Sequence, residues 1–301
     1  MNKIKTIITV LIVLYLAALV SSKLLDSPIS GDLINNGIAV IKIEGPILLS
    51  SSASLFGTDS TSSDEIIANL EKAENNNGVK AIILEINSPG GTVLASKEVA
   101  DKVKSIQKPT IALIREVGAS GAYWIASSSD LIIADELSIT GSIGVISSYL
   151  QFSGLLDNYN VTYERLVTGE FKDLGTPYKE LTPAERNLLM SKLNIIEAKF
   201  VSDVAKNRKM KVEDVQKLAD GSFYLGIEAK QNGLIDLTGN KALAIQKAKE
   251  MANITKENVV EYVKKPSLLN VFDKLASEAS YSIGQGIGSS LTKNEPLIMA
   301  Q

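Results

Sequence analysis

The chain has 301 residues, of which 45% are hydrophobic and 22% charged, a composition that suits one large core or two smaller ones. The formal net charge of -3, with no dense basic stretch, argues against a nucleic-acid partner. The chain contains neither histidine nor cysteine, which excludes a Ser-His-Asp triad, a cysteine nucleophile, a disulfide and any zinc site built on those ligands. If the protein performs acyl transfer, its base must therefore be Lys, Asp or Glu.

The amino terminus predicts a membrane helix. Residues 1–5 include two lysines, and an uncharged run of 17 residues follows at 6–22. As a helix this run would extend roughly 25 Å, just short of a hydrocarbon core, and flanking lysines can snorkel to make up the difference. A retained single-pass signal-anchor is our interpretation, with a signal peptide cleaved near Ser21–Ser22 as the alternative. Both interpretations place residues 1–5 in the cytoplasm and the chain after the apolar run on the extracytoplasmic side of the cell (inner) membrane.

The remainder is interpreted as a linker at 23–36, a folded domain at 37–254 and a weakly patterned tail at 255–301. Apolar and β-branched runs predict strands, and amphipathic runs predict helices. The expected strands are 38–47, 79–86, 109–117 and 131–137, and the expected helices are 63–77, 92–107, 120–130, 182–209, 211–219 and 240–252. Strands that alternate with helices indicate an α/β fold with a largely parallel sheet.

Three glycine-containing loops follow predicted strands. In NSPGG (87–91), the glycine pair lets backbone N–H groups face a ligand, although for this loop alone a plain turn into a helix is the favoured explanation. In GASGA (118–122), Ser120 lies between small residues at a helix amino terminus, which is typical of a nucleophile elbow but also of an ordinary N-cap serine. TGSIG (140–144) is by itself a tight turn with two hydroxyls.

A lysine follows these loops in GEFKDLG (169–175), namely Lys172. By composition it reads as one of many solvated surface lysines. A serine hydroxyl is a weak nucleophile until a base removes its proton, and a lysine amine is a base only when neutral. Burial lowers the pKa of such amines, whereas an ion pair with a carboxylate raises it. Asp173 is adjacent in sequence, so a catalytic role for Lys172 requires that the two side chains point apart.

NSPGG, GASGAYW, TGSIGV and GEFKDLGTPYKELTPAER occur in an order and spacing that resemble the signal peptide peptidase A family, also called protease IV, of the ClpP–crotonase superfamily. The resemblance covers about residues 38–252 and is to the short, single-copy form. It implies that Ser120 is the nucleophile, Lys172 the general base and Ser142 the hydroxyl that orients the lysine amine. It also implies that the backbone N–H groups of Gly91 and Gly121 form the oxyanion hole.

The chain departs from the family pattern at three positions. Ala122 stands where many members have Gly, Trp124 where many have Tyr, and Ser222 where an Arg is common. None of these is a reacting group, so the departures put specificity in doubt more than activity.

The resemblance further implies a ClpP/crotonase-like fold of repeated strand-strand-helix units after the membrane helix. It implies a homo-oligomer, octameric in the short form, whose Ser and Lys come from adjacent protomers. The substrates would be remnant signal peptides and other apolar, unfolded peptides, cleaved without a cofactor or metal. The alternatives are a membrane serine peptidase with a stomatin-like partner, an acyl-coenzyme A enzyme of crotonase type and a non-catalytic membrane scaffold.

Overall fold

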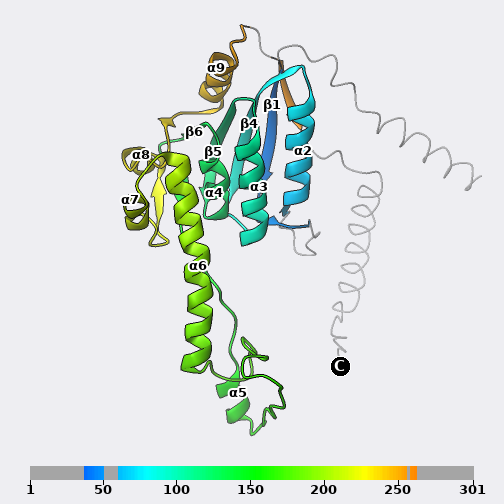
Figure 1. Cartoon of the computed structure of the whole chain (residues 1–301), viewed down its shortest axis with the longest axis vertical. Coiled ribbons are helices and arrows are strands. Elements are labelled where there is room, and N and C mark those ends of the chain that lie inside the picture. Colours follow the sequence, from blue (N-terminus) through cyan, green and yellow to red (C-terminus); the bar gives the residue numbers. More distant parts are fainter. Residues whose placement is uncertain (1–36, 51–59, 256–257, 263–301) are drawn as a thin grey trace, which may run out of the picture. The chain divides into compact units, whose positions relative to one another are not determined.

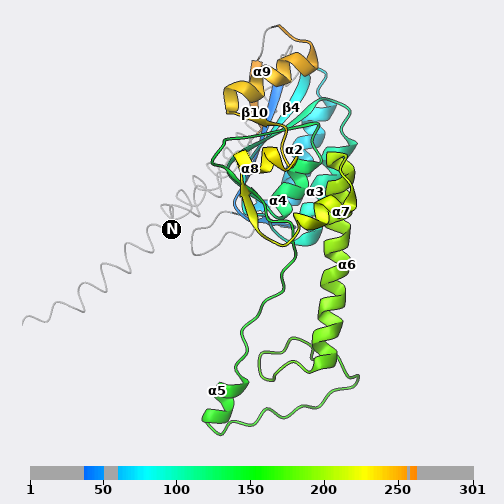
Figure 2. The same cartoon turned by 90° about the vertical axis from the view of Figure 1, so that its left-hand side faces the viewer.

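The computed structural model describes residues 37–50, 60–255 and 258–262 (Figures 1 and 2). These residues form an α/β domain, as the alternation of strands and helices predicts. The expected cytoplasmic terminus, membrane helix and linker lie outside the described residues, as does most of the expected tail. Within the three described ranges, no helix combines the length and the apolar character that crossing a bilayer requires.

In the described part of the chain, eight strands form one sheet with the order β10-β1-β4-β5-β6-β9, and β7 lies beside β5 with β8 beside β7. Every pairing is parallel except the antiparallel pair of β7 and β8. The bounds are β1 (Gly37–Glu44), β4 (Val79–Ser88), β5 (Thr110–Ala119), β6 (Leu131–Ala134), β7 (Ile139–Gly141), β8 (Phe223–Leu225), β9 (Leu237–Thr238) and β10 (Asn258–Tyr262). Two short strands, β2 (Ile47–Leu48) and β3 (Thr61–Ser62), pair separately.

Both faces of the sheet are buried, because successive side chains of a strand point to opposite sides. In β1, Ile38 and Val40 join a core cluster beneath α9 (Lys241–Ala252), whereas Ala39 and Ile41 join the larger cluster on the other face. The larger cluster includes α2 (Ser63–Asn75), α3 (Val93–Ser105) and α4 (Gly121–Ser127). This two-sided burial explains the nearly continuous apolar runs that predict the central strands.

The longest described helix, α6 (Pro183–Arg208), begins at a capping box. The Thr182 hydroxyl accepts from the Glu185 N–H, and the Glu185 carboxylate accepts from the Thr182 N–H. Apart from Glu185 at its start, the buried residues of α6 all lie in its carboxyl-terminal third, from Phe200 onward. Figure 1 shows the rest of α6 extending away from the sheet toward α5 (Ser153–Asn158). Two short helices follow, α7 (Val212–Lys217) and α8 (Gly226–Gln231).

Two of the differences from the sequence-based expectation lie at the two ends of the described domain. The strand expected at 38–47 is divided, because Gly45 has a positive φ of 66° and Pro46 has no N–H to donate. At the other end, β10 lies beyond residue 254 and pairs with β1, so the sheet continues into the segment expected to be a tail. The residues of β10 are half-buried or exposed, and such an edge strand carries no strong apolar signal.

Candidate active site

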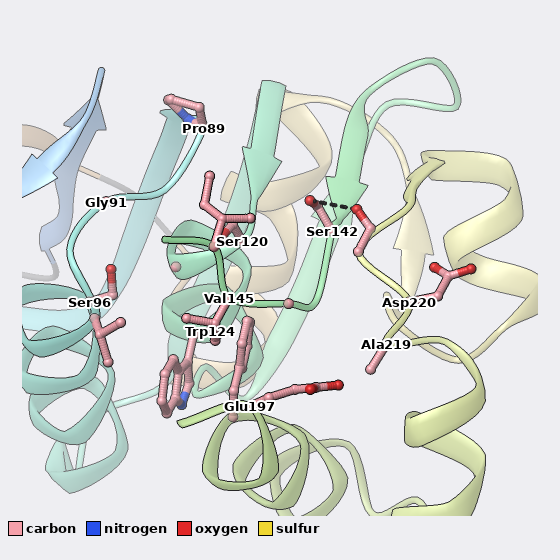
Figure 3. A pocket seen from close by; sticks show the side chains of 16 residues that line it. Pro89, Gly91, Ser96, Ser120, Trp124, Ser142, Val145, Glu197, Ala219 and Asp220 are labelled. Atoms are coloured by element: carbon pink, nitrogen blue, oxygen red, sulfur yellow. Dashed lines mark hydrogen bonds between the residues drawn. The ribbon is translucent and has the colours of Figure 1, made fainter. Parts of the chain in front are cut away.

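The three glycine-containing loops meet at the carboxyl ends of neighbouring strands. Ser88 at the end of β4 pairs with Gly118 of β5, and Ala119 of β5 pairs with Gly141 of β7. Because parallel strands all end at the same edge of a sheet, the loops that follow them come together there. They line one cleft of about 630 Å³, which Figure 3 shows from close by.

Ser120 occupies a sharp turn between β5 and α4. Its backbone has φ 53° and ψ -124°, a conformation that side-chain-bearing residues rarely adopt. Its N–H donates to the Gly141 carbonyl at 2.8 Å, and its carbonyl accepts from the Trp124 N–H at 3.0 Å, so the turn is fixed on both sides. The half-buried side chain lines the cleft. This is the strand–turn–helix geometry of a nucleophile elbow rather than an ordinary N-cap, because Ser120 makes no side-chain cap hydrogen bond.

Two backbone N–H groups lie beside Ser120. Gly121 is the first residue of α4, where an N–H has no partner within the helix. Gly91 forms a parallel bridge with Ile47 in which the Gly90 carbonyl and the Thr92 N–H make the bonds, so the Gly91 N–H points away from Ile47. A Cβ placed on Gly121 would come within 3.3 Å of the Gly91 nitrogen, which puts the two groups close together in the cleft.

Ser142 follows β7 and also lines the cleft. Its backbone has a positive φ of 49°, and its N–H donates to the Ser222 carbonyl at 2.9 Å. Its hydroxyl donates to the Gly221 carbonyl at 3.1 Å, the bond drawn in Figure 3. A hydroxyl that has donated its proton keeps lone pairs that accept from another donor, such as an amine.

One wall of the cleft is aromatic. The Trp124 and Phe200 rings stack with centroids 4.5 Å apart and an interplanar angle of 11°. The Trp124 indole N–H donates to the Asp203 carboxylate at 3.2 Å, which fixes the ring. Val93 and Val145 add to the apolar lining. This wall suits an apolar side chain of a ligand.

Two carboxylates lie on the side of the cleft opposite to Gly91 in Figure 3. Glu197 accepts a hydrogen bond from Gln216 at 3.2 Å, and Asp220 accepts one from the Ser222 N–H at 2.9 Å. The hydrogen bonds from Ser222 lower the pKa of the Asp220 carboxyl, which favours its ionised form. The cleft therefore combines an aromatic wall with an acidic end.

Lys172 is not among the described residues that line the cleft. It lies in the segment that leaves the cleft after Ile146 and ends where α6 begins at Pro183, which we call the arm (residues 147–182). The arm includes α5, and Figures 1 and 2 show α5 at the end of α6 that is remote from the sheet. Lys172 is exposed there, and no described carboxylate forms an ion pair with it. One chain thus gathers Ser120, Ser142, Gly91 and Gly121 but leaves Lys172 outside.

Sequence reasoning missed several residues of the cleft. Glu197 and Phe200 come from α6, whose pattern predicts a helix but not which of its residues meet the loops. Ser96 of α3 lines the cleft with a fully buried hydroxyl that has no hydrogen-bond partner among the described residues. A polar residue on an otherwise apolar helix face was its only signal in the sequence.

Comparison with known proteins agrees with the family resemblance. The family model of peptidase family S49 matches residues 102–255, and that of Clp protease matches residues 47–131. The protein MJ0651 of Methanocaldococcus jannaschii, named as a protease, is 31% identical over 299 residues, which are 97% of this chain and 96% of that one. A protein of Enterococcus faecium, named as a signal peptide peptidase SppA, is 34% identical over 76% of this chain and 67% of its own.

The fold is also known from solved structures. The 1510-N membrane-bound stomatin-specific protease, solved as a mutant with a substrate peptide, aligns with a TM-score of 0.51 at 16% identity. The alignment covers 82% of this chain and all of that one, and at this identity it speaks for the fold alone. With the family model matching half of the chain and MJ0651 aligned almost end to end, this chain belongs to peptidase family S49, a family of serine proteases with a ClpP-like fold.

Proposed function

We propose that this chain is a membrane-anchored serine endopeptidase in which Ser120 is the nucleophile and Lys172 the general base. Ser142 orients the lysine amine, and the N–H groups of Gly91 and Gly121 form the oxyanion hole. The observation that carries the proposal is the elbow at Ser120, which holds a serine against two available N–H groups in a cleft. With no histidine in the chain the base must be Lys, Asp or Glu, and the family resemblance assigns this role to Lys172.

The reaction proceeds through an acyl-enzyme. The neutral amine of Lys172 takes the proton of the Ser120 hydroxyl while Oγ bonds to the carbonyl carbon of the peptide. The resulting oxyanion accepts from the N–H groups of Gly91 and Gly121. The C–N bond then breaks as the lysine ammonium gives its proton to the leaving amine. Water, deprotonated by the same amine, hydrolyses the ester and frees Ser120.

We further propose that the site is completed between subunits of a homo-oligomer, octameric in this short form. The support is that Lys172 lies on the arm and outside the cleft of its own chain. The arm exposes large apolar side chains, among them Leu150, Tyr159 and Leu166, which are 73%, 74% and 88% exposed. Such a surface favours contact with another protein. A second copy of the chain would cover these apolar side chains and would receive Lys172 beside its own Ser120.

The proposed substrates are remnant signal peptides and other apolar, unfolded peptides. The stacked pair of Trp124 and Phe200 supports an apolar side chain beside Ser120. The proposed anchor at 6–22 would hold the enzyme in the cell (inner) membrane with the catalytic domain outside the cytoplasm. A reporter fused after residue 260 tests this topology: it should be active only if it works outside, and activity of a strictly cytoplasmic reporter would refute the anchor's orientation.

The proposal is tested with the full chain and its Ser120→Ala and Lys172→Ala variants on an apolar fluorogenic peptide. Each variant should assemble normally and be inactive. Co-assembled at equal ratio, they should recover about a quarter of the sites, since random mixing pairs an intact serine with an intact lysine in that fraction of interfaces.

Three outcomes would contradict parts of the proposal. Turnover by Lys172→Ala would remove this lysine from the mechanism, and Lys179 would be the next to examine. A mixed oligomer, verified by mass, that stays inactive would exclude the shared site. An inactive wild-type chain would favour the non-catalytic scaffold.

A further inference from the structure

A charged cluster surrounds the turn that carries Lys172. Arg165 donates from Nε and a terminal nitrogen to the two carboxylate oxygens of Asp173, at 2.7 and 2.8 Å. The same terminal nitrogen donates to the Glu170 carbonyl at 2.8 Å. The Lys179 ammonium lies 3.7 Å from Asp173 and forms an ion pair with Glu185.

This cluster fixes both sides of Lys172. Glu170 precedes the lysine by two positions and Asp173 follows it directly, and one guanidinium binds them both. A bidentate Arg–carboxylate pair is planar and geometrically specific, so it sets the direction of the turn as well as its place. The network is anchored at the start of α6, because Glu185, only 2% exposed, also closes the capping box with Thr182.

The cluster also occupies the carboxylate nearest to Lys172 in sequence. Asp173 is 10% exposed, and both of its oxygens accept from Arg165. That hydrogen bonding, with the charge of Lys179, lowers the pKa of Asp173 to about 2, so the carboxylate is ionised at any working pH. Without its partner this anion would be free to pair with the adjacent ammonium, and an ion pair favours the protonated form of a lysine.

We propose that Arg165 is a positioning residue for the catalytic base: it holds the turn around Lys172 and keeps Asp173 from pairing with the amine. The inference rests on the proposed function of Lys172. The other charged or titratable groups of this region are Glu170, Lys179 and Glu185, with the Tyr163 phenol near Arg165. Lys179 does not replace Arg165, because its ammonium is already engaged by the buried Glu185.

The test compares pH profiles of kcat/KM for the assembled full chain on one fluorogenic peptide. Arg165→Gln leaves Asp173 charged, with only the more distant Lys179 ammonium at 3.7 Å beside it, so the acid limb of the profile should move to higher pH by about one to two units. In the double variant Arg165→Gln/Asp173→Asn the rival anion is gone, and the acid limb should return to its wild-type position with a lower kcat from the loosened turn.

Two further variants sharpen the test. Arg186→Gln removes the same charge nearby in α6 from a side chain without a hydrogen bond or ion pair among the described residues, and it should leave the acid limb in place. Arg165→Lys keeps one charged donor for Asp173, so its acid limb should stay near that of wild type. This conservative variant decides the question if Arg165→Gln does not assemble. If the acid limb of the Arg165→Lys profile were displaced by a full pH unit, the inference would be overturned.

Equal acid limbs for Arg165→Gln and the double variant would also overturn the inference, because a merely structural role lowers the rate of both without separating their profiles. The proposed function fails differently. If Lys172→Ala is active, the base itself is misassigned. If Lys172→Ala is inactive and Arg165→Gln keeps the wild-type profile, only the role of Arg165 is refuted.

Discussion

The backbone conformation of Ser120 allows a quantitative prediction about two variants that lack its hydroxyl. Ser120→Ala and Ser120→Gly both remove Oγ and differ only in the Cβ atom. At φ 53° and ψ -124° a Cβ is strained, at a cost of about 1–3 kcal/mol. Glycine avoids this strain but loses roughly 0.5–1 kcal/mol through the greater freedom of the unfolded chain. We therefore expect Ser120→Gly to be more stable than Ser120→Ala by about 1 kcal/mol.

Urea unfolding at a fixed protein concentration measures this difference. The chain has a single tryptophan, Trp124, which is buried in α4 and stacked on Phe200, so its fluorescence reports on this region. In a thermal melt the same difference should appear as roughly 2–4 °C for a domain of this size.

Ser127 provides a matched control, because it is buried in the same helix with ordinary helical geometry. There the order should reverse, with Ser127→Gly less stable than Ser127→Ala by about 1 kcal/mol. If Ser120→Gly were instead the less stable of its pair by a similar amount, the strained elbow would be refuted.

Three further predictions concern the loops and the ion pairs. Gly91→Ala should abolish activity and destabilise the fold, because its Cβ would lie 1.8 Å from the Ile47 carbonyl oxygen; peptidase assays and thermal melts measure both effects. Asp236→Ala should cost about 3 kcal/mol in urea unfolding, since it leaves the Arg208 guanidinium, 9% exposed, without its carboxylate. Wild type should be more stable to urea than Asp173→Asn above pH 5, and this difference in the free energy of unfolding should narrow as the pH falls toward 2. The reason is that the folded pKa of Asp173, about 2, lies below its unfolded value of about 3.9.

Each of these predictions has a contrary result. Gly154→Ala is the control for the first, since nothing lies within 4 Å of its Cβ position, and an equal loss in both variants would remove the steric reason. A wild-type urea midpoint for Asp236→Ala would mean that the Arg208 charge is solvated. A stability gap for Asp173→Asn that widens toward low pH would reverse the sign of the linkage.

The central elements of the fold could be predicted because local signals and tertiary packing agree there. The run at 79–86 is apolar because β4 is buried on both faces, and α6 begins directly after Thr182 because a capping box defines its start. The short strands β7, β8, β9 and β10 could not be predicted. These strands exist because they pair with strands distant in the sequence, as β10 does with β1. A strand of only two to five residues is too short to show a hydrophobic periodicity in the sequence.

The candidate site was predictable to the extent that it consists of loops. Ser120, Ser142, Gly91 and Gly121 follow parallel strands, and the sheet brings such loops to one edge. The contributions of α6 were not predictable, since the angle at which that helix crosses the loops decides which residues face the cleft. The location of Lys172 was equally hidden, because the arm is a long connection whose path is set by ion pairs such as Arg165 with Asp173.

The claim that Ser120 is an activated nucleophile is tested most directly by covalent labelling. A fluorophosphonate reacts with a serine only where a base and an oxyanion hole assist it, and peptide mass spectrometry locates the adduct. Wild type should carry the label on Ser120, and Lys172→Ala should carry almost none although its Ser120 is intact. A label on another serine, or equal labelling of Ser120 in the two proteins, would contradict the Ser120–Lys172 mechanism.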